Sequence, residues 1–347
     1  MPSVSTDPSV VAETTAAPSE SGISAAPQPT LAGRGADGQA PADRLLLRVI
    51  RGTVTRFADL NGKLAFSALL DAAYPFAEGL AAACVGNQWG FLDAQGCWVV
   101  APQFDDVQSF SEGLAVVQRG GDAALVDRQG RLQLPWRPGS LRPPREGLVA
   151  ASHSGQWGFR DCDGDWQIAA TYVDVWSFSQ GLARVQLQDE MTFLDRHGRR
   201  LAGRWADAWD FSEGLAPVRT GLRWGFVDRT GRLVLPALWR EARTFCEGLA
   251  AVQGDNGWGY VDPTGKVVIP PQFEQAEAFS EGLAQVRRNG EIAFIDRLGR
   301  VVLRLAVDRA GALQAGVLEV WVGEDNGFLD RSGRWLIDPH QPIQQAE

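Results

Sequence analysis

Carboxylate side chains recur along this sequence at two regular positions, and paired carboxylates are the groups that many enzymes use as general acid and base. The aspartates of the first set are Asp59, Asp93, Asp127, Asp161, Asp195, Asp228, Asp262, Asp296 and Asp330. The glutamates of the second set are Glu112, Glu146, Glu213, Glu247 and Glu281. A catalytic site needs a few differentiated groups in one place, whereas these groups repeat along the chain. Their recurrence favours a structural role, so we predict no catalytic residue and no enzymatic activity.

Histidine and cysteine side chains are too few and too scattered to predict a metal site. The sequence contains His153, His197, His340, Cys84, Cys97, Cys162 and Cys246. No Cys-x-x-Cys pair occurs, and no histidine stands at ligand spacing from a cysteine. A nucleophile motif and a phosphate-binding glycine loop are also missing. We therefore expect no metal ion, no cofactor and no disulfide.

A single period orders the whole sequence, and it decides the architecture before any one motif does. An Asp followed three residues later by Gly occurs nine times, from Asp59/Gly62 to Asp330/Gly333, and seven of the eight steps are 34 residues long. One unit reads WGFLDAQGCWVVAPQFDDVQSFSEGLAVVQRGG, residues 89–121. The unit predicts a short aromatic strand, a tight Asp-to-Gly turn, a β-branched second strand, a compact crossover and a third strand.

The repeating unit resembles the WG (KWG) repeat of bacterial proteins. The best copies run from Trp224-Gly225-Phe226-Val227-Asp228 to Glu247-Gly248-Leu249-Ala250, and from Trp258-Gly259-Tyr260-Val261-Asp262 to Glu281-Gly282-Leu283-Ala284. The Trp-Gly pair is lost at Ala123-Ala124, Met191-Thr192 and Ile292-Ala293, and Asn326 replaces the last Trp. The resemblance covers residues 53–338 and implies a β-rich repeat architecture without an established catalytic activity.

Repeats of this size must stack on their neighbours to build a core. We predict an all-β array of about eight three-stranded repeats in an open, twisted, solenoid-like stack, with a closed propeller-like toroid as the alternative. Two observations favour the open form. A propeller blade usually takes 40 or more residues, and the chain shows nine hairpins but only eight strands of the Glu-Gly-Leu type.

Composition divides the chain into three parts. Residues 1–44 contain no aromatic side chain and are rich in Pro, Ala, Ser and Thr, which predicts a disordered leader. The array then spans 45–340, and 341–347 form a tail. The net charge of −9 argues against binding nucleic acid. No apolar run is long enough to cross a bilayer, and no signal peptide is evident. We expect no membrane insertion and a cytoplasmic location, with export through a specialised secretion system as the alternative.

Basic residues follow the turn glycine in seven repeats. They are Lys63, Arg131, Arg199, Arg232, Lys266, Arg300 and Arg334. Aligned in the fold, they would form a stripe able to grip a polymer. The turn Asp stands four residues earlier in each case, so we favour ion pairs across the turn. Such exposed pairs contribute at most about 1 kcal/mol.

One repeat departs from the pattern in a way that predicts a binding site. Residues 128–145, which we call the arginine segment, contain five arginines, four prolines and no acidic residue. We predict partner-binding residues at Arg137, Arg142, Arg145 and Trp136, because arginine and tryptophan dominate interface hot spots. A drifted repeat whose arginines merely neutralise nearby acids remains the alternative.

These observations predict a non-enzymatic repeat scaffold that mediates protein–protein interaction. The alternative is a carbohydrate or cell-wall binding module, because exposed tryptophan stacks on sugar rings. Five tryptophans outside the Trp-Gly position are the candidates to serve it: Trp136, Trp166, Trp176, Trp209 and Trp321.

Overall fold

The computed structural model describes residues 45–343, and every regular element in that range is a β-strand. The predicted leader, residues 1–44, lies outside the described residues, as do the last four residues of the predicted tail. The all-β prediction is confirmed. No helix long and apolar enough to cross a membrane occurs between residues 45 and 343.

Nine antiparallel sheets follow one another along the chain, and in each sheet every strand pairs with the next one in sequence. The first sheet is the hairpin of β1 (Leu47–Arg51) and β2 (Val54–Ala58). The next four, which we call blades, are β3 (Ala72–Ala73), β4 (Ala81–Val85), β5 (Gln88–Leu92), β6 (Trp98–Phe104); β7 (Asp106–Val107), β8 (Leu114–Arg119), β9 (Asp122–Asp127), β10 (Leu132–Pro138); β11 (Leu148–His153), β12 (Gln156–Asp161), β13 (Trp166–Tyr172); and β14 (Asp174–Val175), β15 (Leu182–Gln186), β16 (Met191–Asp195).

The remaining four blades are each built from four strands. They are β17 (Asp207–Ala208), β18 (Leu215–Thr220), β19 (Arg223–Asp228), β20 (Leu233–Trp239); β21 (Glu241–Ala242), β22 (Ala250–Gly254), β23 (Gly257–Val261), β24 (Val267–Phe273); β25 (Gln275–Ser280), β26 (Leu283–Arg288), β27 (Glu291–Ile295), β28 (Val301–Leu305); and β29 (Arg309–Gln314), β30 (Val317–Val322), β31 (Asp325–Asp330), β32 (Trp335–Ile337).

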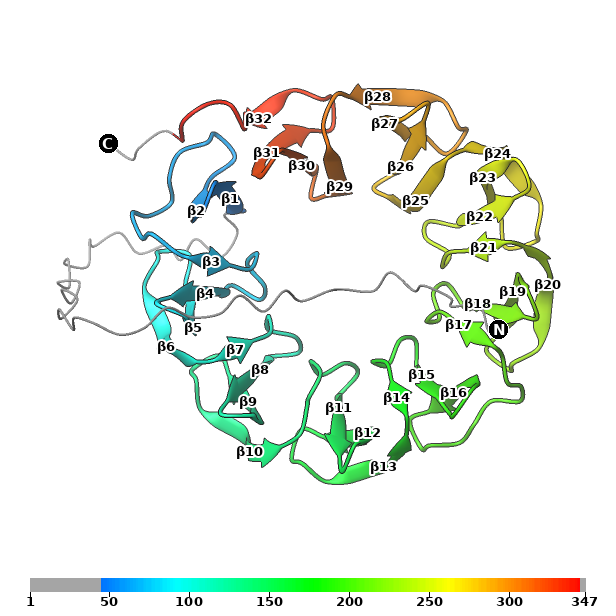
Figure 1. Cartoon of the computed structure of the whole chain (residues 1–347), viewed down its shortest axis with the longest axis horizontal. Helices are drawn as coiled ribbons and strands as arrows, with labels where there is room; N and C mark the ends of the chain where they lie inside the picture. Colours follow the sequence, from blue (N-terminus) through cyan, green and yellow to red (C-terminus); the bar gives the residue numbers. More distant parts are fainter. Residues whose placement is uncertain (1–44, 344–347) are drawn as a thin grey trace, which may run out of the picture. The chain divides into compact units, whose positions relative to one another are not determined.

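Each four-stranded blade combines the end of one repeat with the beginning of the next. The predicted crossover contributes the short strand nearest the ring centre, the Glu-Gly-Leu segment contributes the second strand, and the Trp-Gly hairpin contributes the outer two (Figure 1). In the β3–β6 blade the hairpin partners include Phe91 and Val100. A methyl group on Gly90 would lie 2.4 Å from the Val100 carbonyl oxygen, which is why glycine follows the tryptophan.

The hydrophobic core lies between neighbouring blades. The aromatic residue after Trp-Gly packs against the Phe that precedes the Glu-Gly turn of the next blade. Phe91 and Phe110, for example, have ring centroids 4.7 Å apart in an edge-on arrangement, with Phe91 fully buried. Equivalent pairs recur as Phe159–Phe178, Phe193–Phe211, Phe226–Phe245 and Tyr260–Phe279.

The blades of residues 45–343 close into a ring, a β-propeller of eight blades with the β1–β2 hairpin between the last and the first (Figure 1). The prediction of an open, solenoid-like stack is wrong, and the closed toroid is confirmed. A 34-residue repeat suffices because its innermost strand is often only two residues long, as in β3 and β7. The repeats are also not simply three-stranded, since this short strand lies in what the sequence predicts to be a crossover.

The comparison of nine hairpins with eight Glu-Gly-Leu strands led to the wrong prediction of an open array, because β1 lacks the Glu-Gly pair that precedes the equivalent strand in other repeats. Leu45 stands where the other repeats have the turn glycine, so the hairpin after it looks isolated. In the structure Leu47 and Val49 of β1 are buried against Val317, Phe328 and Ile337 of the last blade. The two ends of the chain therefore do complement each other, through β1 and the β29–β32 blade.

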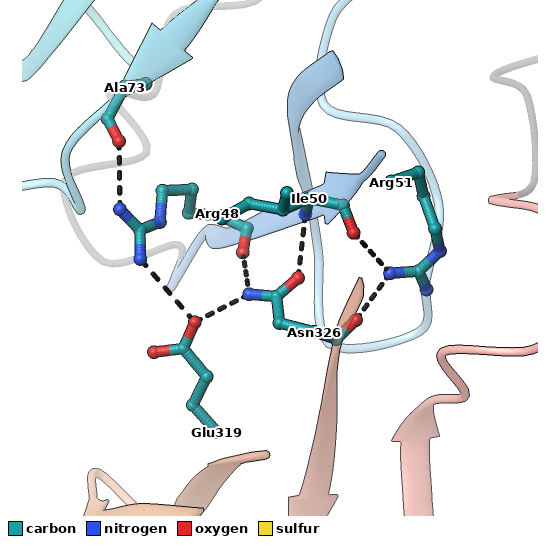
Figure 2. A network of polar contacts seen from close by, with 6 residues as sticks. All are labelled: Arg48, Ile50, Arg51, Ala73, Glu319 and Asn326. Atoms are coloured by element: carbon teal, nitrogen blue, oxygen red, sulfur yellow. Dashed lines mark hydrogen bonds and ion pairs between the residues drawn. The ribbon is translucent and has the colours of Figure 1, made fainter. Parts of the chain in front are cut away.

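A polar network completes this seam between β1 and the last blade (Figure 2). The Asn326 side chain is fully buried. Its Nδ2 donates to the Arg48 carbonyl at 2.8 Å and to Glu319 Oε1 at 2.6 Å, and its Oδ1 accepts the Ile50 N–H at 2.7 Å. Arg51 donates to the Asn326 carbonyl, and Arg48 Nη2 lies 3.7 Å from Glu319 Oε1.

The Asn326 carboxamide substitutes for an inner strand. In the β3–β6 blade the Ala82 carbonyl, which corresponds to that of Arg48, accepts the backbone N–H of Tyr74 at 2.9 Å. Five further blades repeat this bond, from Gln108, Arg142, Trp176, Trp209 and Arg243. On β1 the side chain of Asn326 supplies the donor, which accounts for Asn where other repeats have Trp.

We predict that Asn326→Ala destabilises the protein by about 2–4 kcal/mol, because it removes a fully buried side chain and leaves the partly buried Ile50 N–H and Arg48 carbonyl without their partner. Urea denaturation of the parent and the variant measures the difference. Asn61→Ala, at an exposed turn, is the matched control and should change stability by about 0.5 kcal/mol or less. Equal stability of parent and Asn326→Ala would show that the seam does not depend on this side chain.

Candidate functional site

The nine turn aspartates each hold their own turn. Asp262 Oδ1 accepts the backbone N–H groups of Thr264 at 2.9 Å and of Lys266 at 3.0 Å. The same two bonds, to the residues two and four positions on, form at Asp59, Asp93, Asp127, Asp161, Asp195, Asp228, Asp296 and Asp330. Bonds from the Thr264 hydroxyl and from these backbone groups lower the pKa of Asp262. Because the same two turn bonds form at all nine positions, the predicted structural role of these aspartates is confirmed.

The repeated glutamates connect neighbouring blades. Glu112 Oε2 accepts the N–H of Gly147, one repeat further on, at 2.8 Å. The same link joins Glu78 to Gly113, Glu146 to Gly181, Glu213 to Gly248, Glu247 to Gly282 and Glu281 to Gly316. Gln180 makes it to Gly214 through its amide oxygen. Each of these carboxylates thus forms a hydrogen bond that links its blade to the next one.

The basic residues after the turn glycine form the expected cross-turn ion pairs in part. Arg131, Arg300 and Arg334 each lie 2.7–3.1 Å from the carboxylate of the turn Asp four residues earlier. Their side chains are more than two-thirds exposed, so each pair contributes little to stability. The structure therefore favours local pairing over a continuous cationic stripe.

Arginine side chains stack on all five tryptophans that the carbohydrate-binding alternative would use. The guanidinium carbon of Arg160 lies 3.8 Å from the Trp166 ring centroid, and that of Arg184 lies 3.9 Å from Trp176. The other three contacts are Arg119 on Trp136, Arg184 on Trp209 and Arg309 on Trp321, at 5.1–5.4 Å. A guanidinium therefore already covers part of each indole surface that a sugar would need.

Two of the four predicted partner-binding residues, Trp136 and Arg142, contact neighbouring blades of the ring. Trp136 is half-buried and packs against Phe104 of the preceding blade. Arg142 Nη2 lies 2.8 Å from Asp174 Oδ1, its other terminal nitrogen donates to the Val175 carbonyl, and its guanidinium lies 4.5 Å from the Trp157 ring. Arg142 thus joins two blades.

Arg137 and Arg145 are exposed and, within residues 45–343, form no ion pair. They do not converge on one place. Arg137 lines a cavity of about 250 Å³ between β10 and β11, together with Arg160 and His153. Arg145 lines a more open cavity of about 500 Å³ with Arg142 and Trp176.

The structure also shows charged groups that the sequence prediction missed. Arg184 is buried, and its Nε lies 3.2 Å from Asp210 Oδ1. Burial lowers the pKa of Arg184 and raises that of Asp210, while each charge partly offsets the effect on the other. The signal was present, because Arg184 stands where other repeats have Ala82 or Ala150. Arg160, which lines the smaller cavity, carried the same kind of signal, because it stands where other repeats have Leu92, Val126 or Val227.

This arrangement of blades around a ring defines the protein as a β-propeller. A structure of the eukaryotic initiation factor is similar at 12% identity, with a TM-score of 0.62, over 87% of this chain and 97% of that one. Dihydro-heme d1 dehydrogenase NirN in complex with DHE is similar at 15% identity and a TM-score of 0.48, over 88% and 75%. BamB from Moraxella catarrhalis is similar at 12% identity and a TM-score of 0.44, over 83% and 95%. The likeness to the initiation factor, at 12% identity, shows the fold alone.

The family model of the WG containing repeat matches residues 56–89, 89–121, 157–190, 224–257 and 258–291. The chain belongs to the WG-repeat proteins. No curated protein matches the sequence. The resemblance inferred from the repeating unit is thereby confirmed.

We predict that stability falls as pH drops from about 4 to about 2. The Ser332 hydroxyl and the Arg334 backbone N–H lower the pKa of Asp330 to about 2, from an ordinary value near 3.8. A depressed folded-state pKa stabilises the fold above the unfolded-state value, and that contribution is lost as pH falls through the folded-state value. The melting temperature should therefore decline within this window.

Melts of Asp330→Asn at a series of pH values test the assignment. Asparagine keeps an oxygen that can accept the turn bonds but does not titrate, so the decline should be shallower than in the parent. Asp189→Asn, at an exposed aspartate outside the turns, is the control and should follow the parent curve. A parent melting temperature that stays constant down to pH 2 would contradict the prediction.

Proposed function

We propose that this protein is a non-enzymatic scaffold that binds a protein partner, and that the contact surface includes the arginine segment of the β7–β10 blade and the neighbouring β11–β13 blade. Propellers and WG repeats commonly mediate protein interactions. The proposal assigns no catalysis to the chain. A cytoplasmic location would suit such a scaffold.

The observation that carries the proposal is the state of Arg137 and Arg145. Both guanidinium groups are exposed and without an ion pair among the described residues, on a chain whose net charge is −9. The repeated carboxylates, by contrast, serve the ring itself, as the turn aspartates and the inter-blade glutamates do. Unpaired arginines near half-buried tryptophan are typical of interface hot spots.

The carbohydrate-binding alternative has weaker support. Sugar rings stack on an open indole face, but an arginine lies on each of the five tryptophans that would serve. Trp209, the most exposed of them at 48%, also stacks against Trp224. No observation favours this function over protein binding.

We predict that Arg137→Ala/Arg145→Ala reduces partner recovery about tenfold or more in an affinity pull-down from the native host. Arg142 is left intact, because it holds Asp174 and the next blade in place. Identified partners are then titrated against the purified parent and variant.

The matched control is Arg199→Ala/Arg232→Ala, which removes two exposed arginines from other blades and should leave recovery unchanged. Equal recovery by both folded double variants would remove the arginine segment from the interface. Failure of the parent to retain any protein above background would overturn the scaffold function itself.

A further inference from the structure

The cavity between β10 and β11 exists because one repeat has lost its tryptophan. Ala123 occupies the position of Trp89, Trp157, Trp224 and Trp258 in other repeats, and those indoles pack into the inter-blade clusters. Ala123 instead lines an open space of about 250 Å³.

The other lost tryptophans are compensated locally. Met191 is buried in one cluster with Phe193 and Trp205, Ile292 is 1% exposed in another, and Asn326 closes the ring. The cavity at Ala123 is thus a feature of one repeat rather than a general consequence of losing Trp-Gly.

The floor of the cavity is apolar. Ala123, Leu134, Leu141 and Ala151 line it, and all four belong to one buried cluster between the β7–β10 and β11–β13 blades. This surface suits an aliphatic or aromatic group of a ligand rather than a fully hydrated ion.

The rim of the same cavity is cationic and preorganised. Arg160 stacks on Trp166 at 3.8 Å and donates a hydrogen bond to the Gly164 carbonyl. Arg137 approaches the same place, since a methyl group on Gly164 would lie 3.7 Å from its Nη2. His153 also lines the cavity.

No carboxylate within the described residues forms an ion pair with either guanidinium. Burial lowers the pKa of Arg160 and the nearby charge of Arg137 lowers it further, with Asp165 and Asp161 offsetting part of the effect. The carboxylate of Asp161 is itself engaged by the N–H groups of Asp163 and Asp165 in its own turn. Two adjacent arginines in this state are complementary to an added anion.

We infer that this cavity binds the C-terminal residue of a protein partner, with the terminal carboxylate between Arg137 and Arg160 and an apolar last side chain against Leu134 and Leu141. The volume suits one side chain with its carboxylate and is too small for a folded element. The Oγ of Ser152, which also lines the cavity, accepts the Ser140 N–H. The Ser152 hydroxyl proton can therefore be donated to the terminal carboxylate of the partner. This inference rests on the proposed function and names the chemistry that its site recognises.

Fluorescence polarisation with a dye-labelled hexapeptide ending in Leu tests the inference directly on the full chain. The peptide with a free C-terminal carboxylate should bind saturably, and the same peptide with an amidated C-terminus should bind at least about tenfold more weakly. Free 4-methylpentanoate is the competitor that separates a small organic acid from a peptide. It should displace the peptide only at concentrations far above the peptide's own Kd.

Two variants locate the binding. Ala123→Trp restores the residue of the other repeats and fills the cavity, so binding should be lost. Arg137→Gln removes an exposed guanidinium with little risk to folding and should weaken binding about tenfold, whereas the control Arg232→Gln should not. If Ala123→Trp melts below the parent, Arg137→Gln and the amidated peptide decide the question.

Equal binding of the free and amidated peptides, or no saturable binding up to millimolar peptide, would overturn the inference. Tighter binding of free 4-methylpentanoate than of the peptide would also overturn it in favour of a small-acid site. The scaffold function fails separately, in the pull-down. A partner that depends on Arg137 and Arg145 but shows no carboxylate dependence would leave the scaffold standing without this cavity as its anchor.

Discussion

The contact between consecutive blades is the interaction on which this structure depends. No blade buries its large side chains alone, because the aromatic partner of the Phe91 ring is Phe110 of the next blade. The hydrogen bond from the Gly113 N–H to Glu78 Oε2 crosses the same boundary at the turns. Every blade is therefore completed by its neighbour, and an array with two free ends would leave one apolar face uncovered at each end.

Ring closure removes that exposed face, but it requires the two chain ends to fit each other. In other blades the backbone of the inner strand donates a hydrogen bond to the carbonyl that corresponds to that of Arg48. Here the Asn326 carboxamide supplies a donor and an acceptor to β1 instead, and Arg48, Arg51 and Glu319 surround it (Figure 2). Apolar packing of Leu47 and Val49 excludes water from this seam, which strengthens hydrogen bonds that would contribute little in solvent.

The local structure could be predicted from the sequence, whereas the closure of the ring could not, and the reason is physical. Turn geometry depends on residues within four positions of each other, so Asp262 and Gly265 are enough to predict the turn. In the structure Gly265 has a φ of +85°, as that turn requires. Closure depends on Ile50 and Asn326, which are 276 residues apart and carry no shared motif. The same distinction applies to the predicted binding residues. The charge of Arg142 is visible in the sequence, but its engagement by Asp174 and Trp157 belongs to the folded ring.

Departures from the repeat acquire meaning only when the structure shows what replaces the lost group. At Met191 another aromatic fills the space, and at Asn326 a polar side chain takes over a strand's hydrogen bonds. At Ala123 the space stays open and two guanidinium groups border it. The three positions share a lost tryptophan and differ in what the ring supplies in its place. Of the three, only Ala123 leaves an apolar floor bordered by two guanidinium groups without an ion pair in the described part of the chain, and this combination complements a ligand that is apolar at one end and anionic at the other.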